Sequence, residues 1–210
     1  MNLYSRYVFP RLLDLAMSSE ALAKHRRSLL ADVQGHVLEI GFGTGLNLPY
    51  YSSAVTHLTT VDPNPGVNVL AQRRVAESVI PVEFHLLWSE ALPFGGDTFD
   101  CAVSTWTLCS IPQVEQALQE LYRVLKPGGK FFFIEHGLSP DPQLQIWQNR
   151  LTPLQKIIAD GCHLNRNMRS LVTSIFSQVQ LSEFIEPSLP KIGGYFYQGI
   201  AVKEASQPRH

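Results

Sequence analysis

Short apolar runs recur along the middle of the chain, and each has the length of a buried strand. They cover residues 37–40, 57–61, 82–87, 99–105 and 131–136. Between them, residues 66–78 and 113–125 place apolar side chains at helical spacing. Strands that alternate with helices in this way predict an α/β fold, in which helices cover both faces of a mostly parallel sheet.

The pattern changes after the last of these runs. Two helical stretches within residues 140–177 flank the polar segment 160–166. Residues 179–185 and 195–202 then form two strand-like runs joined by a loop rich in proline and glycine. We interpret these two runs as an antiparallel hairpin at one edge of the sheet, which brings the predicted sheet to seven strands.

An aromatic and apolar stretch precedes the first strand run. Pro10 starts or kinks a helix there, and a second helix opens at residues 18–20 and stops near Gly35. We expect these helices to pack against the sheet and to cover a ligand site as a lid. Contact with a membrane surface is the alternative, because aromatic residues alternate with Arg6 and Arg11.

The bulk composition is that of a single globular domain. Of the 210 residues, 45% are apolar and 17% are charged, and the net charge of −1 gives no reason to expect a nucleic-acid partner. Three cysteines, an odd number, fit a reducing compartment without a disulfide framework, so we expect a cytoplasmic protein. No apolar run in the sequence approaches the roughly 20 residues of a membrane span.

Three glycines at alternate positions follow the first strand run: Gly41, Gly43 and Gly45. Glycine allows backbone angles and close approaches that a Cβ would forbid, so we expect a ligand to lie against this main chain. The alternative is a plain glycine-rich turn between a strand and a helix. Residues 48–51 are predicted to shorten or end that helix.

An acidic residue downstream argues for a nucleotide as the ligand. Asp62 ends the second strand run, just before Pro63. A strand, glycine loop, helix, strand and acid form the βαβ nucleotide-binding arrangement, in which the acid accepts hydrogen bonds from ribose hydroxyls. Asp62 could also cap the turn at Pro63, and both roles can hold together. If Asp62 contacted only ribose, its loss would weaken ligand binding with little change in the stability of the apo protein.

The spacing of the glycine loop separates two classes of nucleotide. The dinucleotide fingerprint needs a glycine where Leu46 stands, and here the third glycine comes one residue early. Glu39, two residues before the first glycine, would repel a pyrophosphate but attract the sulfonium and ammonium groups of S-adenosylmethionine. The sequence therefore favours S-adenosylmethionine over NAD, with a capping or solvated Glu39 as the alternative. Asn47 either reaches the cofactor or acts as a cap.

Several segments resemble the class I S-adenosylmethionine-dependent methyltransferases. Residues 38–45 look like the first motif of the family, and residues 122–134 look like its L-x-R-V-L-K-P-G-G segment. Residues 88–94 are similar to its adenine-side motif, although Trp88 stands where an acid is usual. An aromatic side chain there would stack on adenine or fill the core. The cofactor-binding residues that we expect are Glu39, Gly41, Gly43, Gly45, Asn47, Asp62, Pro63, Ser89, Glu90 and Thr105.

The transferred methyl group should lie beyond the carboxyl ends of the central strands. Cys109 follows the fourth strand run, but no base neighbours it in sequence, and we interpret it as a buried, inert thiol. His136 ends the fifth run and is the best-placed titratable group, so we expect it to assist catalysis. A hydrogen-bonded core histidine is the alternative. Cys162 and His163 are adjacent, and the sequence has no second pair of cysteines or histidines at the spacing of a metal-binding motif. We therefore predict no metal site.

Three short segments narrow the resemblance to one group. Cys109-Ser110, Glu135-His136 and residues 160–166 look like the methyltransferase-like-seven group, thiol methyltransferases of animal endoplasmic reticulum and lipid droplets, and their bacterial relatives. The resemblance implies methyl transfer to a small-molecule thiol. The animal proteins carry an N-terminal hydrophobic anchor without a counterpart here, so we expect at most a peripheral membrane contact.

The residues expected around the methyl position are largely apolar and aromatic: Trp106, Leu108, Cys109, Ile111, His136, Tyr4 and Tyr7. Such a lining favours an uncharged, hydrophobic thiol, because burial of an unpaired charge is costly. Three alternatives stay open. They are methyl transfer to an amine such as a phospholipid headgroup, a cofactor-binding module without activity, and a nicotinamide-dependent reductase.

The predicted organisation is a single Rossmann-like domain over residues 1–210, the class I methyltransferase sandwich. Its core binds the cofactor, and the flanking segments cover the core and shape the acceptor site. The expected bounds are 1–35 for the helical lid, 36–136 for the cofactor-binding core, 137–178 for the acceptor-site insertion and 179–203 for the C-terminal hairpin.

Overall fold

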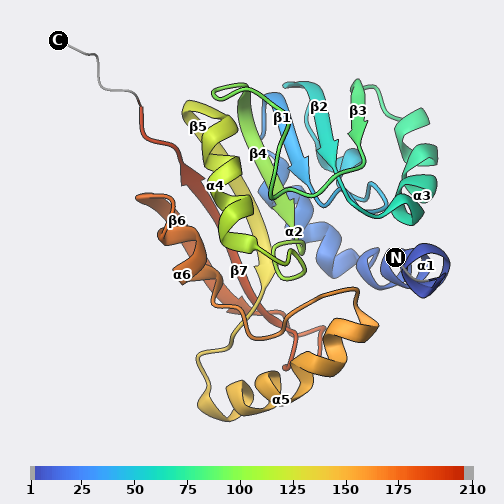
Figure 1. Ribbon diagram of the computed structural model, residues 1–210, viewed down its shortest axis with the longest axis vertical. Coiled ribbons are helices and arrows are strands. Elements are labelled where there is room, and N and C mark those ends of the chain that lie inside the picture. Colours follow the sequence, from blue (N-terminus) through green and yellow to red (C-terminus); the bar gives the residue numbers. More distant parts are fainter. Residues whose placement is uncertain (1–2, 206–210) are drawn as a thin grey trace.

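The computed structural model describes residues 3–205, so residues 1, 2 and 206–210 of the predicted domain lie outside it. Seven strands form one sheet: β1 (Gly35–Ile40), β2 (Val55–Val61), β3 (Val82–His85), β4 (Phe99–Thr105), β5 (Leu125–His136), β6 (Gln178–Ile185) and β7 (Tyr195–Val202). Their order is β3-β2-β1-β4-β5-β7-β6 (Figure 1). The strands β1 to β5 pair in parallel, whereas β7 is antiparallel to both of its neighbours. The predicted fold class is confirmed, including the antiparallel C-terminal hairpin.

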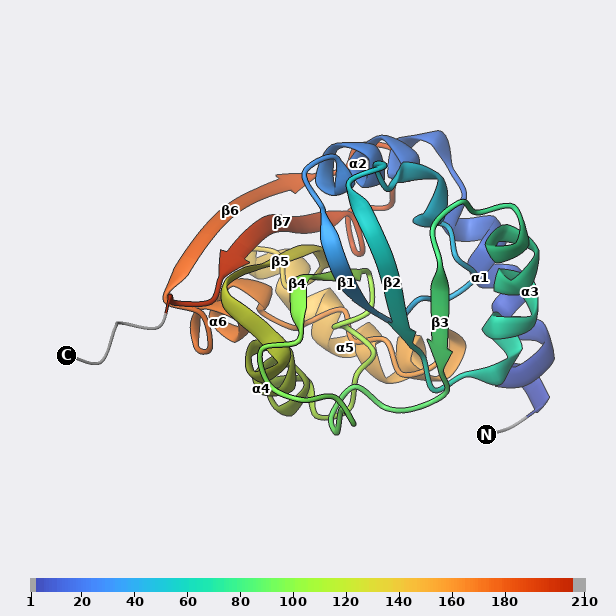
Figure 2. The same ribbon diagram turned by 90° about the horizontal axis from the view of Figure 1, so that it is seen from above.

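Helices cover both faces of this sheet (Figure 2). Along the described part of the chain they are η1, a π-helix (Tyr4–Val8), α1 (Phe9–Met17), α2 (Glu20–Leu30), the 3₁₀ turn η2 (Leu48–Tyr50), α3 (Pro65–Ala76), α4 (Val114–Val124), α5 (Pro142–Ile158) and α6 (Met168–Thr173).

The alternation of side chains along β5 divides the core between the two faces. Phe131 and Phe133 pack with residues of α4 and α6 in one cluster. Phe132, between them, packs with residues of α2 and α3 in the other cluster. All three rings are fully buried, as expected for a central strand that is covered on both sides.

One predicted element is missing from the structure. The glycine loop was expected to lead into a short helix, but only the single 3₁₀ turn η2 follows it. Pro49 contributes to this, because a proline cannot donate the main-chain hydrogen bond that would continue an α-helix from the glycine loop. The fifth strand is also longer than predicted, since β5 begins at Leu125 and includes the proline–glycine segment that we expected to precede it.

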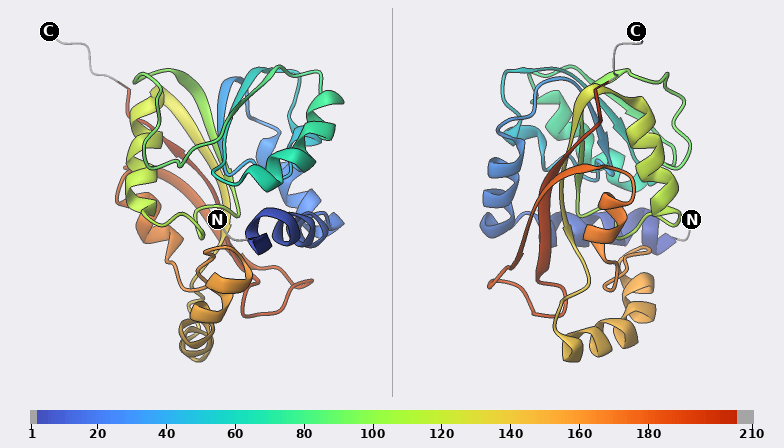
Figure 3. Two further views of the ribbon diagram at one scale, coloured as in Figure 1. Left: turned by 45° about the vertical axis from the view of Figure 1, so that its right-hand side comes forward. Right: turned by 90° about the vertical axis from the view of Figure 1, so that its left-hand side faces the viewer.

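The lid and the insertion meet the sheet at the same end. The parallel strands point their carboxyl ends toward the space between α1 and α5 (Figure 3). Helix α1 leaves Leu12 and Leu15 half or more exposed. Between residues 3 and 205, no helix combines the length and the apolar character needed to cross a membrane.

Candidate cofactor and acceptor site

A cavity of about 740 Å³ lies at the carboxyl ends of the strands, within the range of roughly 300–1,000 Å³ that is usual for small-ligand sites. Its wall combines the glycine loop, the ends of β2, β4 and β5, helix α1 and the segment between α5 and α6. The predicted site residues on this wall are Gly41, Gly43, Asn47, Asp62, Pro63, Ser89, Thr105 and His136. The predicted residues Glu39, Gly45 and Glu90 are not on it.

The glycine loop is bent so that it can lie against a ligand but cannot cradle a phosphate. Gly43 has a φ of 57°, and a Cβ built there would meet nothing closer than 3.9 Å, so the loop leaves room for a ligand at this point. The three glycine amides already donate within the protein, to the Val61 carbonyl, the Asp62 carboxylate and the Phe42 carbonyl. No α-helix N-terminus follows the loop, so the features that bind a pyrophosphate in dinucleotide sites are missing here.

Asp62 organises the loop from the end of β2. One carboxylate oxygen accepts the Gly43 N–H at 2.9 Å and the other accepts the Asn64 N–H at 2.8 Å. Burial raises the pKa of Asp62 to about 6, although both N–H groups oppose the shift. Each carboxylate oxygen has a second lone pair, so Asp62 can bind these amides and still accept hydrogen bonds from a ligand. The predicted capping and ligand roles are therefore geometrically compatible.

Glu39 acts behind the wall rather than on it. Its carboxylate accepts hydrogen bonds from Asn47 Nδ2 at 2.8 Å and from the Tyr51 hydroxyl at 2.7 Å, and its side chain is fully buried. Burial raises the pKa of Glu39 to about 7 against the effect of these two donors. Glu39 does not line the cavity, whereas its hydrogen-bond partner Asn47 does, so an effect of Glu39 on a bound cation would pass through Asn47.

Arg26 on α2 is a cation on the wall that sequence reasoning missed. Its Nε donates to Asn47 Oδ1 at 3.1 Å, and its guanidinium lies 4.8 Å from the ring centre of Trp106. Burial lowers the pKa of Arg26 to about 10, which still leaves it charged at neutral pH. In the sequence Arg26 lies within Lys24-His25-Arg26-Arg27, a basic run that is typical of the solvent-exposed face of a helix. Nothing local distinguishes Arg26 from its neighbours.

The segment that resembles the adenine-side motif reaches the cavity wall with Trp88 and Ser89 but not with Glu90. Trp88 lines the cavity and is 55% exposed, so it does not fill the core. Ser89 also lies on the wall. Glu90 turns away and accepts a hydrogen bond from the Gln113 N–H at 3.4 Å.

Most of the residues expected around the methyl position lie on the cavity wall. Trp106, Cys109, Ile111, His136 and Tyr4 all line it. Two residues of the predicted lining are elsewhere. The Leu108 side chain is fully buried in the cluster beneath the site, and Tyr7 lies half exposed on the outside of η1.

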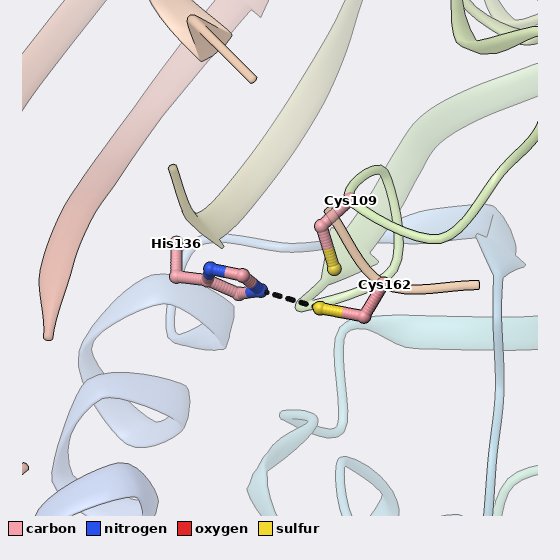
Figure 4. A group of neighbouring side chains, drawn as sticks. All are labelled: Cys109, His136 and Cys162. Atoms are coloured by element: carbon pink, nitrogen blue, oxygen red, sulfur yellow. Dashed lines mark hydrogen bonds between the residues drawn. The ribbon is translucent and has the colours of Figure 1, made fainter. Parts of the chain in front are cut away.

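His136 meets two cysteines that are distant in sequence (Figure 4). Its Nε2 lies 3.1 Å from Cys162 Sγ, and one ligand atom each from Cys109, His136 and Cys162 all fall within 4.8 Å of one another. A hydrogen bond with Cys109, together with burial, raises the pKa of the Cys162 thiol well above its usual range. The argument from spacing against a metal site considered only Cys162 and His163, and it does not apply to this arrangement.

Comparison with known proteins agrees with this geometry. A family model described as a methyltransferase domain matches residues 38–133. Thiol S-methyltransferase TMT1A from Homo sapiens is 30% identical over 203 residues, which cover 88% of this chain and 81% of that protein. The chain belongs to this family of S-adenosylmethionine-dependent methyltransferases.

A second relative of this methyltransferase agrees in sequence, and a solved structure agrees in fold. Thiol S-methyltransferase TMT1B from Rattus norvegicus is 39% identical over 150 residues, covering 69% of this chain and 61% of the relative. The crystal structure of the YcgJ protein from Bacillus subtilis matches the fold with a TM-score of 0.67 at 18% identity, over 89% of this chain and 99% of that one.

Hydrogen bonds from two sides hold the loop that follows β4 in this methyltransferase. Glu135, fully buried at the end of β5, accepts hydrogen bonds from the Ser104 hydroxyl and from the N–H groups of Thr107 and Leu108, all at 3.1 Å or less. The Arg166 guanidinium donates to the Leu108 carbonyl from the opposite side. Burial raises the pKa of Glu135 against these donors. The position of Cys109 is therefore set by groups on β5 and on the insertion.

Proposed function

We propose that this methyltransferase transfers the methyl group of S-adenosylmethionine to a small, hydrophobic thiol. The observation that carries the proposal is the lining of the acceptor end. Two carboxylates lie on the described cavity wall, Asp62 and Asp160. Asp62 holds the glycine loop, and Asp160 accepts hydrogen bonds from the Ser5 hydroxyl at 2.8 Å and from Asn64 Nδ2 at 3.3 Å. A cationic amine would compete with these bonds, whereas a neutral thiol finds an apolar wall.

We propose that the cofactor occupies the part of the cavity beside the glycine loop. When bound, S-adenosylmethionine supplies an activated methyl group on a sulfonium sulfur. We propose that Gly41 and Gly43 lie against it, that Asp62 accepts its ribose hydroxyls, and that Ser89 and Trp88 contact the adenine. Asn47, Pro63 and Thr105 complete this half of the wall, and Glu39 acts through Asn47. Arg26 then offers a cation to the carboxylate of the amino-acid portion.

Catalysis would rest on positioning rather than on strong acid–base chemistry. A thiol reacts as its thiolate, and its reference pKa of about 8.5 is close to neutrality. The wall places the acceptor, and residues 3–35 together with 137–178 exclude water, which raises the effective concentration of the reacting groups. We propose that His136 assists acceptor binding or deprotonation at this end.

An assay over matched acceptors tests the proposed function. We expect S-methylation of a small alkyl or aryl thiol and no methylation of the alcohol of identical shape. Strong methylation of phosphatidylethanolamine together with inert thiols would contradict the thiol assignment and favour an amine acceptor. Titration with NAD in parallel tests the reductase alternative, because a reductase would bind NAD more tightly than S-adenosylmethionine.

Cofactor binding is expected to depend on pH between about 5.5 and 7.5. Burial raises the pKa of Asp62 to about 6 and that of Glu39 to about 7, so both carboxylates take up protons in this interval. A ligand that carries a cation and ribose hydroxyls favours the ionised forms. Its Kd should therefore increase at least ~tenfold as the pH falls across this window. Calorimetric titration at several pH values measures this change.

The apo protein should show the opposite trend. Because both folded-state pKa values lie above the unfolded ones, the folded state binds more protons between about pH 4 and 7. The contribution of these two groups to the free energy of unfolding then decreases as the pH rises through that range. The variant Glu39→Gln should flatten both trends. A Kd that is independent of pH would contradict the assigned contacts.

We also propose a cytoplasmic location, because the three cysteines, Cys101, Cys109 and Cys162, are free and buried. The exposed Leu12 and Leu15 on α1 support a peripheral contact with a membrane near the cavity.

A further inference from the structure

Three soft side chains converge at the acceptor end of the cavity from three separate parts of the fold. Cys109 follows β4, His136 ends β5, and Cys162 lies between α5 and α6 (Figure 4). All three are buried, all three line the cavity, and their ligand atoms lie within 4.8 Å of one another. The proposed function gives His136 a general role but leaves both thiols unused.

The backbone around these residues is fixed. The Cys109 carbonyl accepts the His163 N–H at 2.9 Å and also lies 3.0 Å from His163 Nδ1, which ties the two cysteine segments together. Glu135 holds the loop just before Cys109 through the Leu108 N–H. The two thiols are therefore held in place by groups that are independent of the thiols themselves.

The side chains of the cluster make several weak polar contacts. Cys109 Sγ lies 3.6 Å from the Trp106 carbonyl oxygen and 3.6 Å from the Ser110 hydroxyl, and it is hydrogen-bonded with Cys162. Cys162 Sγ lies 3.1 Å from His136 Nε2 and accepts a weak hydrogen bond from Gln155 Nε2 at 3.8 Å. Among residues 3–205, His136 Nδ1 has no hydrogen-bond partner. The only polar contact of the His136 imidazole among residues 3–205 is therefore with a sulfur atom. A histidine and a cysteine that bind the same metal ion lie side by side in the same way.

This donor set has the chemistry of a zinc site. Two thiolates and one imidazole with an open position is a ligand set of catalytic zinc, and soft sulfur ligands select zinc over the hard cations. In a tetrahedral site, Zn–S bonds of about 2.3 Å and Zn–N bonds of about 2.0–2.1 Å put the ligand atoms roughly 3.5–3.8 Å apart. A spread of 4.8 Å therefore needs a closing movement of about 1 Å, which side-chain rotation can supply.

We propose that Cys109, His136 and Cys162 bind a Zn²⁺ ion whose fourth position faces the cavity and takes the sulfur of the acceptor thiol. This proposal rests on the proposed thiol methylation for its second half only. Zinc deprotonates a thiol that coordinates it and holds the sulfur at one point. In this way the bound zinc would generate the thiolate nucleophile in an apolar pocket that has no strong base.

The reaction balances without an oxidant or reductant. The acceptor releases its proton to solvent when its sulfur binds the metal. The sulfur then forms a bond to the methyl carbon, and the bond between that carbon and the sulfonium breaks. The electron pair of the broken bond stays on the sulfur of S-adenosylhomocysteine. The product is a neutral thioether, which is a weaker ligand than a thiolate and can leave.

Metal binding can be measured without any turnover. The full-length protein is stripped with a chelator, titrated with Zn²⁺ alone against a chromogenic indicator, and dialysed for elemental analysis. We expect one zinc ion per chain. Replacement by Co²⁺ should give the absorption bands of tetrahedral cobalt with thiolate ligands. Absence of stoichiometric zinc, or a cobalt spectrum without thiolate bands, would overturn the site.

Single substitutions assign the ligands. Cys109→Ser, His136→Ala and Cys162→Ser should each weaken zinc binding by roughly 100-fold or more, because loss of a ligand exceeds the 10–100-fold cost of losing an outer hydrogen-bond partner. Cys101→Ala is the matched control, since Cys101 is a buried free cysteine on β4 away from the cavity wall. Circular dichroism confirms that each variant is folded. Unchanged zinc affinity in the three folded variants would overturn the assignment.

The acceptor's role is tested on the cobalt-loaded protein. A small hydrophobic thiol should shift the thiolate bands, and its alcohol counterpart should not. If the thiol leaves the spectrum unchanged, the second half of the proposal is wrong. Thiol methylation by a protein that binds no zinc would overturn this inference and keep the proposed function. Zinc binding with no methylation of any thiol would overturn the proposed function and the role of the acceptor thiol as fourth ligand, and would keep the metal site.

Discussion

Asp62→Asn is expected to weaken S-adenosylhomocysteine binding at least ~tenfold and to lower the free energy of unfolding by about 1–3 kcal/mol. Both carboxylate oxygens accept main-chain N–H groups, from Gly43 and Asn64. An asparagine has one acceptor oxygen, so its NH₂ group would face one of these donors. From the sequence we expected a loss of affinity alone. The hydrogen bonds to the loop add the loss of stability. Calorimetry and thermal unfolding measure the two effects separately.

Asp160→Asn is the matched control for this substitution. Asp160 is the other carboxylate on the described cavity wall, and its partners are the Ser5 hydroxyl and the Asn64 side-chain amide. A hydroxyl accepts a hydrogen bond as readily as it donates one, so asparagine can keep both contacts. Its positive φ of 45° is also one that asparagine tolerates. Equal losses of affinity in the two variants would mean that only the total negative charge of the cavity matters.

Removal of residues 1–17 should reduce kcat/KM for methyl transfer by at least ~100-fold, because it opens the acceptor site to water. Helix α1 and the turn before it supply a whole side of the cavity: Tyr4, Phe9, Leu12, Leu13, Ala16 and Met17. Asp14 anchors α1 to the body through Arg74 at 2.9 Å and the Thr44 hydroxyl at 2.6 Å. The measurement is turnover of a small thiol by a truncated protein whose folding has been checked by circular dichroism.

Two point variants test whether the truncation acts by uncovering the acceptor site. Asp14→Ala keeps α1 but removes its anchor, and it should lower kcat/KM in the same direction by a smaller factor. Leu15→Ala changes a side chain of the same helix that is 76% exposed, and it should have no effect. Full activity in the truncated protein would show that the segment only packs against the sheet.

The sequence predicted the sheet well because the information for strands is local. The run at 99–105 coincides with β4, and the two final runs match β6 and β7 within one residue. The missing helix after the glycine loop shows where local reasoning is weakest. Residues 48–51 were expected to shorten or end that helix, and the structure keeps only the 3₁₀ turn at Leu48–Tyr50.

The site was predicted less completely because its residues come together only through the order of the strands in the sheet. Cys109, His136 and Cys162 are separated by 26 or more positions, and only the adjacency of β4 and β5 together with the return of the insertion brings them together. Arg26 is placed by the docking of α2, and its position within a basic stretch gives no signal of this. Single-sequence patterns specify elements, but a contact between distant segments depends on how the elements pack.

The two segments that cover the cavity also bind each other. The Tyr4 hydroxyl donates to the Ile158 carbonyl at 2.7 Å, and the Ser5 hydroxyl donates to Asp160 at 2.8 Å. Asn64 joins both by donating to the Ser5 carbonyl at 2.9 Å and to Asp160. These bonds form a latch between parts of the chain more than 150 positions apart. We expect a nucleoside product the size of S-adenosylhomocysteine to leave when these bonds open, and opening on the microsecond-to-millisecond scale would then limit turnover.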